Sequence, residues 1–192
     1  MLLKMKDCLL GKKPGFGLIE VMFAIALIGI MAAIALPAFS RRQAGYERKR
    51  FVTGFNALLS EAQQVALEKG KLVRVFFNFT TRTITVQTVK DFYALEKEYE
   101  SVALIYAENN FIWPESQEIE NFFVNGIDEM NQHEVTTTLW FFIVPSGTAQ
   151  QVIINIRDMH GTVSVDGKPY SLVINPLTAQ CREYYEFQIP SA

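Results

Sequence analysis

Glu20 is the residue of this sequence that most clearly needs a partner of opposite charge. It is the one charged residue in an apolar run of 24 residues, Phe16 to Phe39. As a helix rising about 1.5 Å per residue, the run is roughly 36 Å long, enough to cross a hydrocarbon core about 30 Å thick. A lone carboxylate costs free energy in such a segment, so we expect a partner of opposite charge for Glu20.

Three interpretations of the apolar run compete. A plain single-pass anchor would tolerate an acid near its end. A secretory signal peptide would be cut near the small residues Ala33-Ile34-Ala35, but the run exceeds the usual apolar core of about 7–15 residues and Glu20 sits inside its start. The third interpretation depends on the residues that precede the run, which are the basic pair Lys12 and Lys13 and the junction Gly15-Phe16.

The stretch Gly15-Phe16-Gly17-Leu18-Ile19-Glu20-Val21 resembles the class III signal of type IV pilins and pseudopilins. The resemblance implies that a prepilin peptidase cuts after Gly15 and then N-methylates Phe16. It also implies a helix bend at Pro37. The freed α-amine of Phe16 is cationic, with a reference pKa near 8, and the resemblance makes Glu20 its counter-charge in a neighbouring subunit.

The remaining pattern predicts a long helix followed by a β-rich head. Apolar residues recur at three- and four-residue spacing from Phe51 to Ala66, and Gly70 is a good helix stop. We therefore expect an α+β protein, in which a long N-terminal transmembrane helix packs on an antiparallel, β-sandwich-like, pilin-like head. The expected parts are a cleaved leader (1–15), a transmembrane and assembly helix (16–39), its periplasmic continuation (40–70) and a periplasmic head (71–192).

Alternation of apolar and polar residues predicts the strands of the head. They are expected at Leu72–Phe79, Thr83–Val89, Thr136–Val144, Gln151–Arg157, Thr162–Val165, Pro169–Ile174 and Glu183–Ile189. Turns are expected at Thr80–Arg82, Pro114, Asn125-Gly126, Pro145–Gly147, Asp166-Gly167 and Asn175–Thr178. The stretch Asp91–Ala107 is compatible with a short helix or a strand, with Phe92, Leu95, Tyr99, Ala103 and Leu104 pointing inward.

Charge is distributed unevenly along the chain. Residues 51–192 hold nine basic and seventeen acidic residues, a balance of −8, which argues against a broad basic face for nucleic acid. Segment 91–134 alone holds eleven acids and one base. It is either a solvated loop region or a contact surface for a neighbouring subunit or an exported protein, and no ligand spacing supports a cation site there.

A second charged cluster precedes the head. Arg41, Arg42 and Arg48-Lys49-Arg50 are expected to be solvated or bound to lipid headgroups.

The residue types that carry catalysis are sparse. The two cysteines are Cys8, in the expected leader, and Cys181, which we expect to be a buried thiol without a disulfide partner after cleavage. His133, His160 and Cys181 match no zinc spacing. No nucleophile elbow or phosphate loop is present, so we expect no enzyme activity, no metal and no cofactor.

The order of elements resembles the H-type minor pseudopilins of type II secretion systems and the related minor pilins. The likeness rests on a helix pattern, a turn and a late strand; these are Leu59, Ala62, Ala66, Gly70 and Val73, then Val144–Gly147, then Leu172–Thr178. It implies a structural subunit of the periplasmic pseudopilus that drives protein export, inserted in the bacterial inner membrane. The implied partners are sister pseudopilins, the prepilin peptidase, the inner-membrane assembly platform and exported proteins, with no nucleic acid.

Three other functions remain open from the sequence. A minor type IV pilin would serve pilus priming, adhesion or DNA uptake. A secreted soluble β protein would lose the apolar run with its signal peptide. A hydrolase tethered to the membrane would need a cleft with a base and a nucleophile, and the sequence shows neither.

Overall fold

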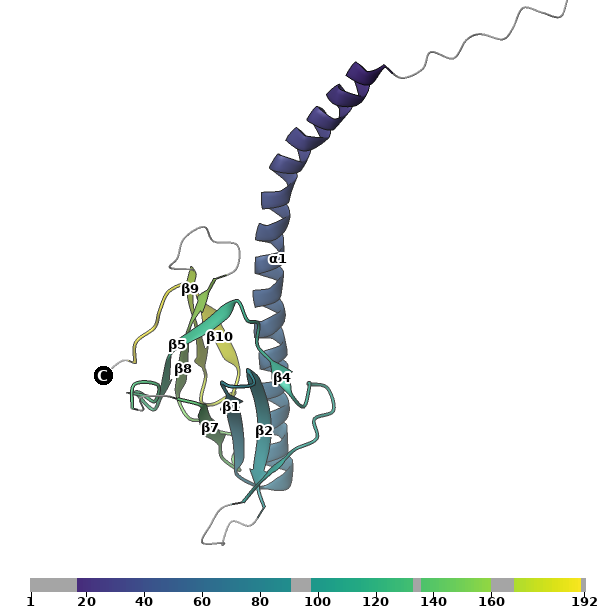
Figure 1. Ribbon diagram of the computed structural model, residues 1–192. Helices are drawn as coiled ribbons and strands as arrows, with labels where there is room; N and C mark the ends of the chain where they lie inside the picture. Colours follow the sequence, from purple (N-terminus) through teal and green to yellow (C-terminus); the bar gives the residue numbers. More distant parts are fainter. Residues whose placement is uncertain (1–16, 91–97, 133–135, 160–167, 191–192) are drawn as a thin grey trace, which may run out of the picture. The chain divides into compact units, whose positions relative to one another are not determined.

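The computed structural model describes residues 17–90, 98–132, 136–159 and 168–190, with the side chains of 34–45 left out. The chain divides into two units, residues 1–40 and 41–192. The first unit contributes the beginning of the helix α1 (Leu18–Lys69), and the second contains the rest of α1 and all the strands. Figure 1 shows the elements in chain order.

The end of α1 lies where the sequence predicts it. Gly70 follows Lys69 and has a φ of +59°, a conformation that glycine adopts without a steric penalty and that stops a helix. Within the second unit, the buried side chains of α1 follow the predicted helical spacing; they include Phe51, Phe55, Leu58, Leu59, Ala62, Val65 and Ala66. This stripe supplies the helical part of the core.

The first sheet is antiparallel and is built around β1. Its strands are β1 (Val73–Asn78), β2 (Thr83–Val89), β3 (Tyr99–Ser101), β4 (Phe111–Ile112) and β7 (Thr138–Ile143). Their order is β3-β2-β1-β7, and β4 also pairs with β2. Phe77 in β1 lies opposite Ile84 in β2 and Leu139 in β7, so that the apolar residues of three strands share one face.

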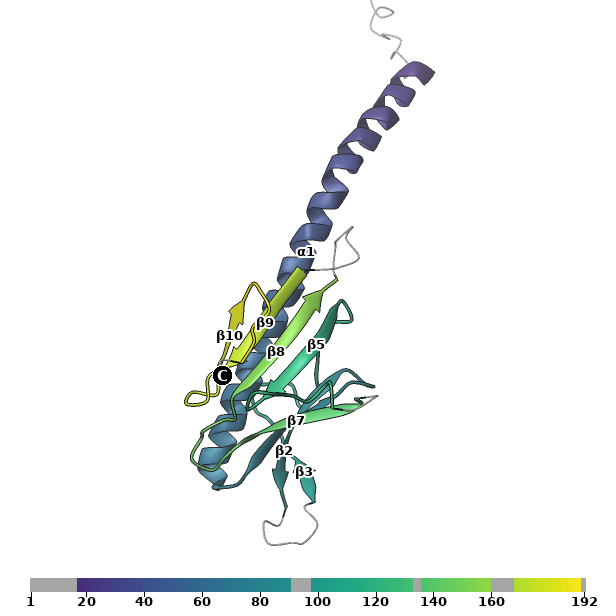
Figure 2. The ribbon, with the colours of Figure 1, turned by 90° about the vertical axis from the view of Figure 1, so that its left-hand side faces the viewer.

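The second sheet, whose strands lie side by side in Figure 2, is also antiparallel. Its strands are β5 (Gln117–Val124), β6 (Ile127–Asp128), β8 (Val152–Asp158), β9 (Lys168–Ile174) and β10 (Cys181–Tyr184). The order is β10-β9-β8-β5-β6. Asn125 and Gly126 both have positive φ, of 50° and 88°, which makes them the predicted tight turn between β5 and β6.

One core joins α1 to both sheets. The ring of Phe77 lies 6.0 Å from that of Phe55 in α1 and 5.0 Å from that of Phe122 in β5. Phe77 is 1% exposed, and each ring contact is of the edge-on or offset kind that aromatic pairs prefer. The expected α+β class with an antiparallel head is confirmed, whereas its sandwich-like stacking stays a prediction.

Two expectations for the acidic segment differ from the structure. Gln117–Val124 form β5, an eight-residue strand inside the second sheet, so the interpretation of the segment as a solvated loop region does not hold there. Its acids Glu118 and Glu120 lie outside the core while Phe122 and Val124 are buried, so the strand is amphipathic despite its charge. In Asp91–Ala107, the strand alternative holds at Tyr99–Ser101, which form β3, and Leu104 is buried as expected, whereas Ala103 is exposed.

The last strand is also misplaced by the sequence pattern. It is Cys181–Tyr184 and not Glu183–Ile189. The chain after it is bound to β8 and β9 by side chains, because Gln188 N–H donates to Asn155 Oδ1 at 3.2 Å and Ser171 Oγ donates to the carbonyl of Glu186 at 2.7 Å. The expected inward residues Phe92 and Leu95, and the strand Thr162–Val165 with its Asp166-Gly167 turn, lie outside the described residues.

Candidate assembly site

Glu20 caps the N-terminus of its own helix. Its Oε2 accepts a hydrogen bond from the Gly17 N–H at 3.0 Å, and the Gly17 carbonyl accepts one from the Glu20 N–H at 3.0 Å. This reciprocal pair is the acidic half of a capping box, and a carboxylate at this end also opposes the positive pole of the helix. The geometry uses one oxygen of Glu20 and places the charge at the first turn.

The helix that follows Glu20 exposes apolar side chains on all sides. Large exposed residues include Leu18 (81%), Phe23 (70%) and Met31 (69%). A helix that is apolar around its whole circumference belongs in an apolar environment, either a membrane or a bundle of similar helices. Among the described residues, no helix meets the combined requirements of length and hydropathy for a membrane span.

Three of the predicted site residues are not placed in detail. Gly15 and Phe16 lie outside the described residues, and the cleavage and methylation there stay predictions. The backbone of Pro37 lies within α1, whose bounds run from Leu18 to Lys69, and the bend expected at this proline also stays a prediction.

Arg48 has a role in the head that the sequence did not indicate. Its Nε lies 3.0 Å from Glu183 Oε1 in β10, and both side chains are 22% exposed. Its guanidinium lies over the rings of Tyr170 and Tyr185, at 5.4 and 5.2 Å. The expectation that this residue is solvated or lipid-bound is therefore wrong, because Arg48 ties α1 to the second sheet.

The edge of β10 is sealed by α1. Asn56 donates from Nδ2 to the Cys181 carbonyl at 3.2 Å and accepts at Oδ1 from the Cys181 N–H at 2.8 Å. The side-chain amide thus takes the place of a neighbouring strand, which protects an edge that could otherwise pair with another chain.

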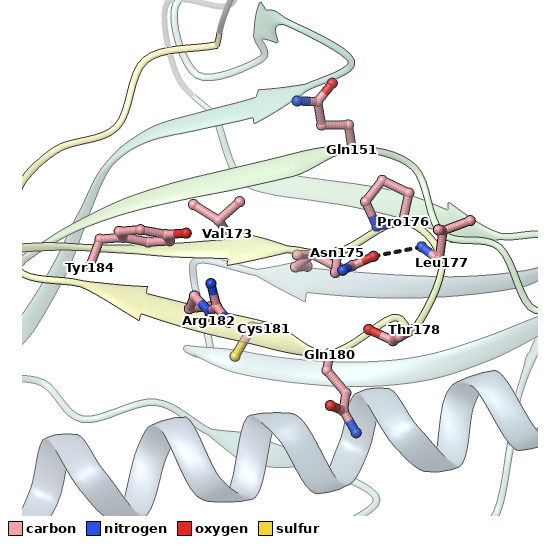
Figure 3. A pocket seen from close by; sticks show the side chains of 11 residues that line it. Gln151, Val173, Asn175, Pro176, Leu177, Thr178, Gln180, Cys181, Arg182 and Tyr184 are labelled. Atoms are coloured by element: carbon pink, nitrogen blue, oxygen red, sulfur yellow. Dashed lines mark hydrogen bonds between the residues drawn. The ribbon is translucent and has the colours of Figure 1, made fainter.

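Cys181 is a buried thiol, as predicted. The side chain is 9% exposed, and burial raises the pKa of its thiol to about 12. Figure 3 shows its sulfur on the side of β10 that faces α1, below a hollow of about 620 Å³ around the turn Asn175–Thr178. The turn is held by the Leu177 N–H, which donates to Asn175 Oδ1 at 2.9 Å. A protonated thiol directed into the core is unsuited to nucleophilic chemistry.

Glu61 is a buried carboxylate that sequence reasoning missed. It is 7% exposed, and it accepts hydrogen bonds from three successive backbone N–H groups, those of Ile105, Tyr106 and Ala107. Burial alone would raise its pKa, but the three donors together outweigh burial and lower the pKa. The available signal was its position three residues after Leu58 and four before Val65, on the buried stripe of α1.

The described part of the chain contains no cluster of three or more His, Cys, Asp or Glu side chains suited to a metal ion. His133 and His160 lie outside it. The described residues show helix capping at Glu20, an ion pair between Arg48 and Glu183, and exposed apolar side chains at the start of α1.

Known proteins resemble this chain in two respects, its N-terminal sequence and its fold. Residues 11–36 match the family described as the prokaryotic N-terminal methylation motif. About a third of the chain is similar in sequence to pilins. A fimbrial protein of Pseudomonas aeruginosa is 41% identical over 61 residues, which are 32% of this chain and 40% of that protein. The type IV major pilin protein PilA of Myxococcus xanthus (strain DK1622) is 40% identical over 60 residues, 31% of this chain and 27% of PilA. The matches thus span less than half of each curated relative.

The solved structure of the minor pseudopilin EpsH from the type 2 secretion system of Vibrio cholerae has a similar fold. It superimposes with a TM-score of 0.50 and 14% sequence identity, over 71% of this chain and 94% of EpsH. At this identity the likeness concerns the fold alone. The chain is therefore a pilin-like protein by fold, and it carries the N-terminal methylation motif.

Proposed function

We propose that this chain is a structural subunit of a periplasmic filament. An N-terminal methylation motif includes the start of a helix with exposed apolar side chains, and the same chain has a pilin-like fold; this combination is the observation that carries the proposal. The subunit is held in the bacterial inner membrane by residues 16–39, with its head, 71–192, in the periplasm. The prepilin peptidase cuts after Gly15 and methylates the new N-terminus at Phe16.

Glu20 sets the position of one subunit against the next. Its Oε2 accepts a hydrogen bond from the Gly17 N–H. Its other oxygen accepts a hydrogen bond from the cationic α-amine of Phe16 in a neighbouring subunit. A charged residue inside a membrane helix costs free energy, up to about 2.5–3.5 kcal/mol at the membrane centre on insertion scales, so pairing with a cation favours association over the isolated helix. A helix bend at Pro37 is part of the same proposal.

The assembly that we favour is the pseudopilus of a type II secretion system, with this chain as a minor pseudopilin. The fold likeness to a minor pseudopilin over 94% of that chain supports it. Its partners are sister pseudopilins and the inner-membrane assembly platform. A minor type IV pilin is the second candidate, since the curated relatives are a fimbrial protein and a major pilin.

Deletion of the gene separates these two candidates. Loss of protein export with intact surface pili supports the pseudopilin, and loss of pili with intact export supports the type IV pilin. Co-purification of the full chain from membranes with the products of neighbouring pilin-like genes tests the filament itself. A chain that is found alone in the soluble fraction would contradict both.

A further inference from the structure

Residues 104–116 run beside α1 and form with it a surface that we call the α1 flank (Figure 1, beside β4). The contacts follow the helix toward its N-terminus. Glu61 binds the N–H of Ala107 at 2.9 Å, the ring of Phe111 stacks on Phe51 at 5.7 Å, and Ser116 Oγ lies 3.5 Å from Glu47 Oε2. The flank is therefore fixed at both ends and in the middle.

The flank displays apolar side chains that the fold does not bury. Ile105 is 81% exposed, Tyr106 is 86% exposed and Ile112 is 62% exposed. The N–H groups of Ile105 and Tyr106 are the ones that Glu61 holds, so the loop cannot turn these side chains inward without releasing a buried carboxylate. The exposure of these large apolar groups costs free energy in an isolated subunit.

A groove of about 730 Å³ opens on the same surface. Its apolar floor includes Phe51, Phe111 and Trp113, which are at most 9% exposed. The charged residues that line it are Glu47, Glu108, Glu115 and Arg50, a balance of −2. Its occupant should therefore combine an apolar or aromatic group with a cation.

The chain itself contains a stretch with this chemistry. Residues 41–50 hold five basic residues and one acid. Within the stretch, Tyr46 is 70% exposed and Lys49 is also exposed, three residues further along one face of α1. Lys49 has no partner among the described residues, in contrast to Arg48, which binds Glu183.

We propose that the α1 flank of one subunit binds Tyr46 and Lys49 of a second copy of this chain. Tyr46 packs against the apolar side chains of the flank, and the Lys49 ammonium lies between Glu108 and Glu115. The two contacting surfaces differ, so the contact is heterologous. This inference rests on the proposed filament function and specifies one of its contacts.

Cysteine cross-linking in cells tests the contact. Two full-length copies with different tags are produced together, one with Thr53→Cys and the other with Asn110→Cys, both in a Cys8→Ser background. Both positions are exposed beside the proposed contact and leave its charged residues in place. A short bis-maleimide is expected to join the two tags. The control pair replaces Asn110→Cys with Thr81→Cys, an exposed position in the β1–β2 turn, and should give no product.

Charge reversal shows whether complementarity drives the contact. The cross-link is followed between the same Thr53→Cys and Asn110→Cys copies. Glu108→Lys with Glu115→Lys in the Asn110→Cys copy should lower the yield about tenfold, and Lys49→Glu in the Thr53→Cys copy should restore it. Unchanged yields would overturn the proposal.

The failure of this contact can be told apart from the failure of the proposed function. If the chain co-purifies with other pilin-like subunits but gives no 53–110 product between its own copies, this inference is wrong and the filament function stands. If it co-purifies with no such subunit and gives no product, both fail.

Discussion

The carboxylate of Glu61 in α1 accepts a hydrogen bond from the backbone N–H of Ala107 at 2.9 Å. The N–H groups of the two preceding residues point at the same carboxylate. Three donors converging on one buried anion form a charge-assisted cluster, which is stronger than the same number of neutral hydrogen bonds. The cluster fixes the start of the α1 flank, so its removal should affect both stability and association.

Glu61→Gln should lower the free energy of unfolding by about 1–3 kcal/mol, because the amide is neutral and can present only one oxygen to the three donors. Denaturant unfolding of the full chain in a non-ionic detergent measures the change. Glu68→Gln is the matched control, since Glu68 is an exposed acid on the same helix whose Oε1 accepts a hydrogen bond from Gln64 Nε2 at 2.7 Å. The control should change stability by less than about 0.5 kcal/mol, and equal losses in the two variants would contradict the role given to Glu61.

The same carboxylate predicts a dependence of stability on acid. The pKa of Glu61 is lowered in the folded state from its ordinary value of 4.5, so its contribution is present above that pH and is lost as the pH falls through the folded pKa. The difference in melting temperature between the wild type and Glu61→Gln should be largest at neutral pH and shrink below pH 4.5. A difference that stays constant down to acid pH would show that the carboxylate charge is not involved.

Cys181 should be inert to thiol reagents in the folded protein. Burial raises its pKa to about 12, so the reactive thiolate is scarce at pH 8 and the sulfur is also shielded from reagents. In a Cys8→Ser background, Ellman's reagent should modify the native chain slowly and the unfolded chain fast. Ser146→Cys, at an exposed turn, provides a rapidly reacting control. Equal rates at the two sites would place Cys181 outside the core.

Glu20→Ala should leave membrane insertion intact and impair assembly. Deleting one partner of a buried ion pair leaves the other charge uncompensated, at a cost of about 3–5 kcal/mol. Co-purification with other pilin-like subunits measures the loss, and membrane fractionation checks insertion. Glu20→Asp retains the charge and should recover part of the assembly. Normal co-assembly of the alanine variant would refute the assembly role of Glu20.

The sequence predicts those helices and strands in which the spacing of apolar residues matches the residues that the fold buries. The spacing of Phe51, Phe55 and Leu58 indicates a helix face, and the alternation around Val75 and Phe77 indicates a strand, because the burial of those residues depends on the period of their own element. The strand β5 is missed because the acids within it mask its alternation.

The interactions between distant elements could not be predicted in this way. Arg48 lies 135 positions from Glu183 in the sequence, and Asn56 lies 125 positions from Cys181. In the sequence, Arg48 and Asn56 look like ordinary polar residues on the exposed face of a helix. After β10, the side chains of Asn155 and Ser171 form hydrogen bonds with the backbone of Gln188 and Glu186 in place of strand pairing. Only the fold brings these partners together.

The mass of the N-terminal peptide of the mature protein tests the central claim most directly. Full-length protein is isolated from membranes of its own host, and its first peptide is sequenced by mass spectrometry. The proposed assembly requires a chain that begins at Phe16 with one methyl group on its α-amine. A chain that still carries Met1, or that begins after the apolar run near Leu36, would contradict it.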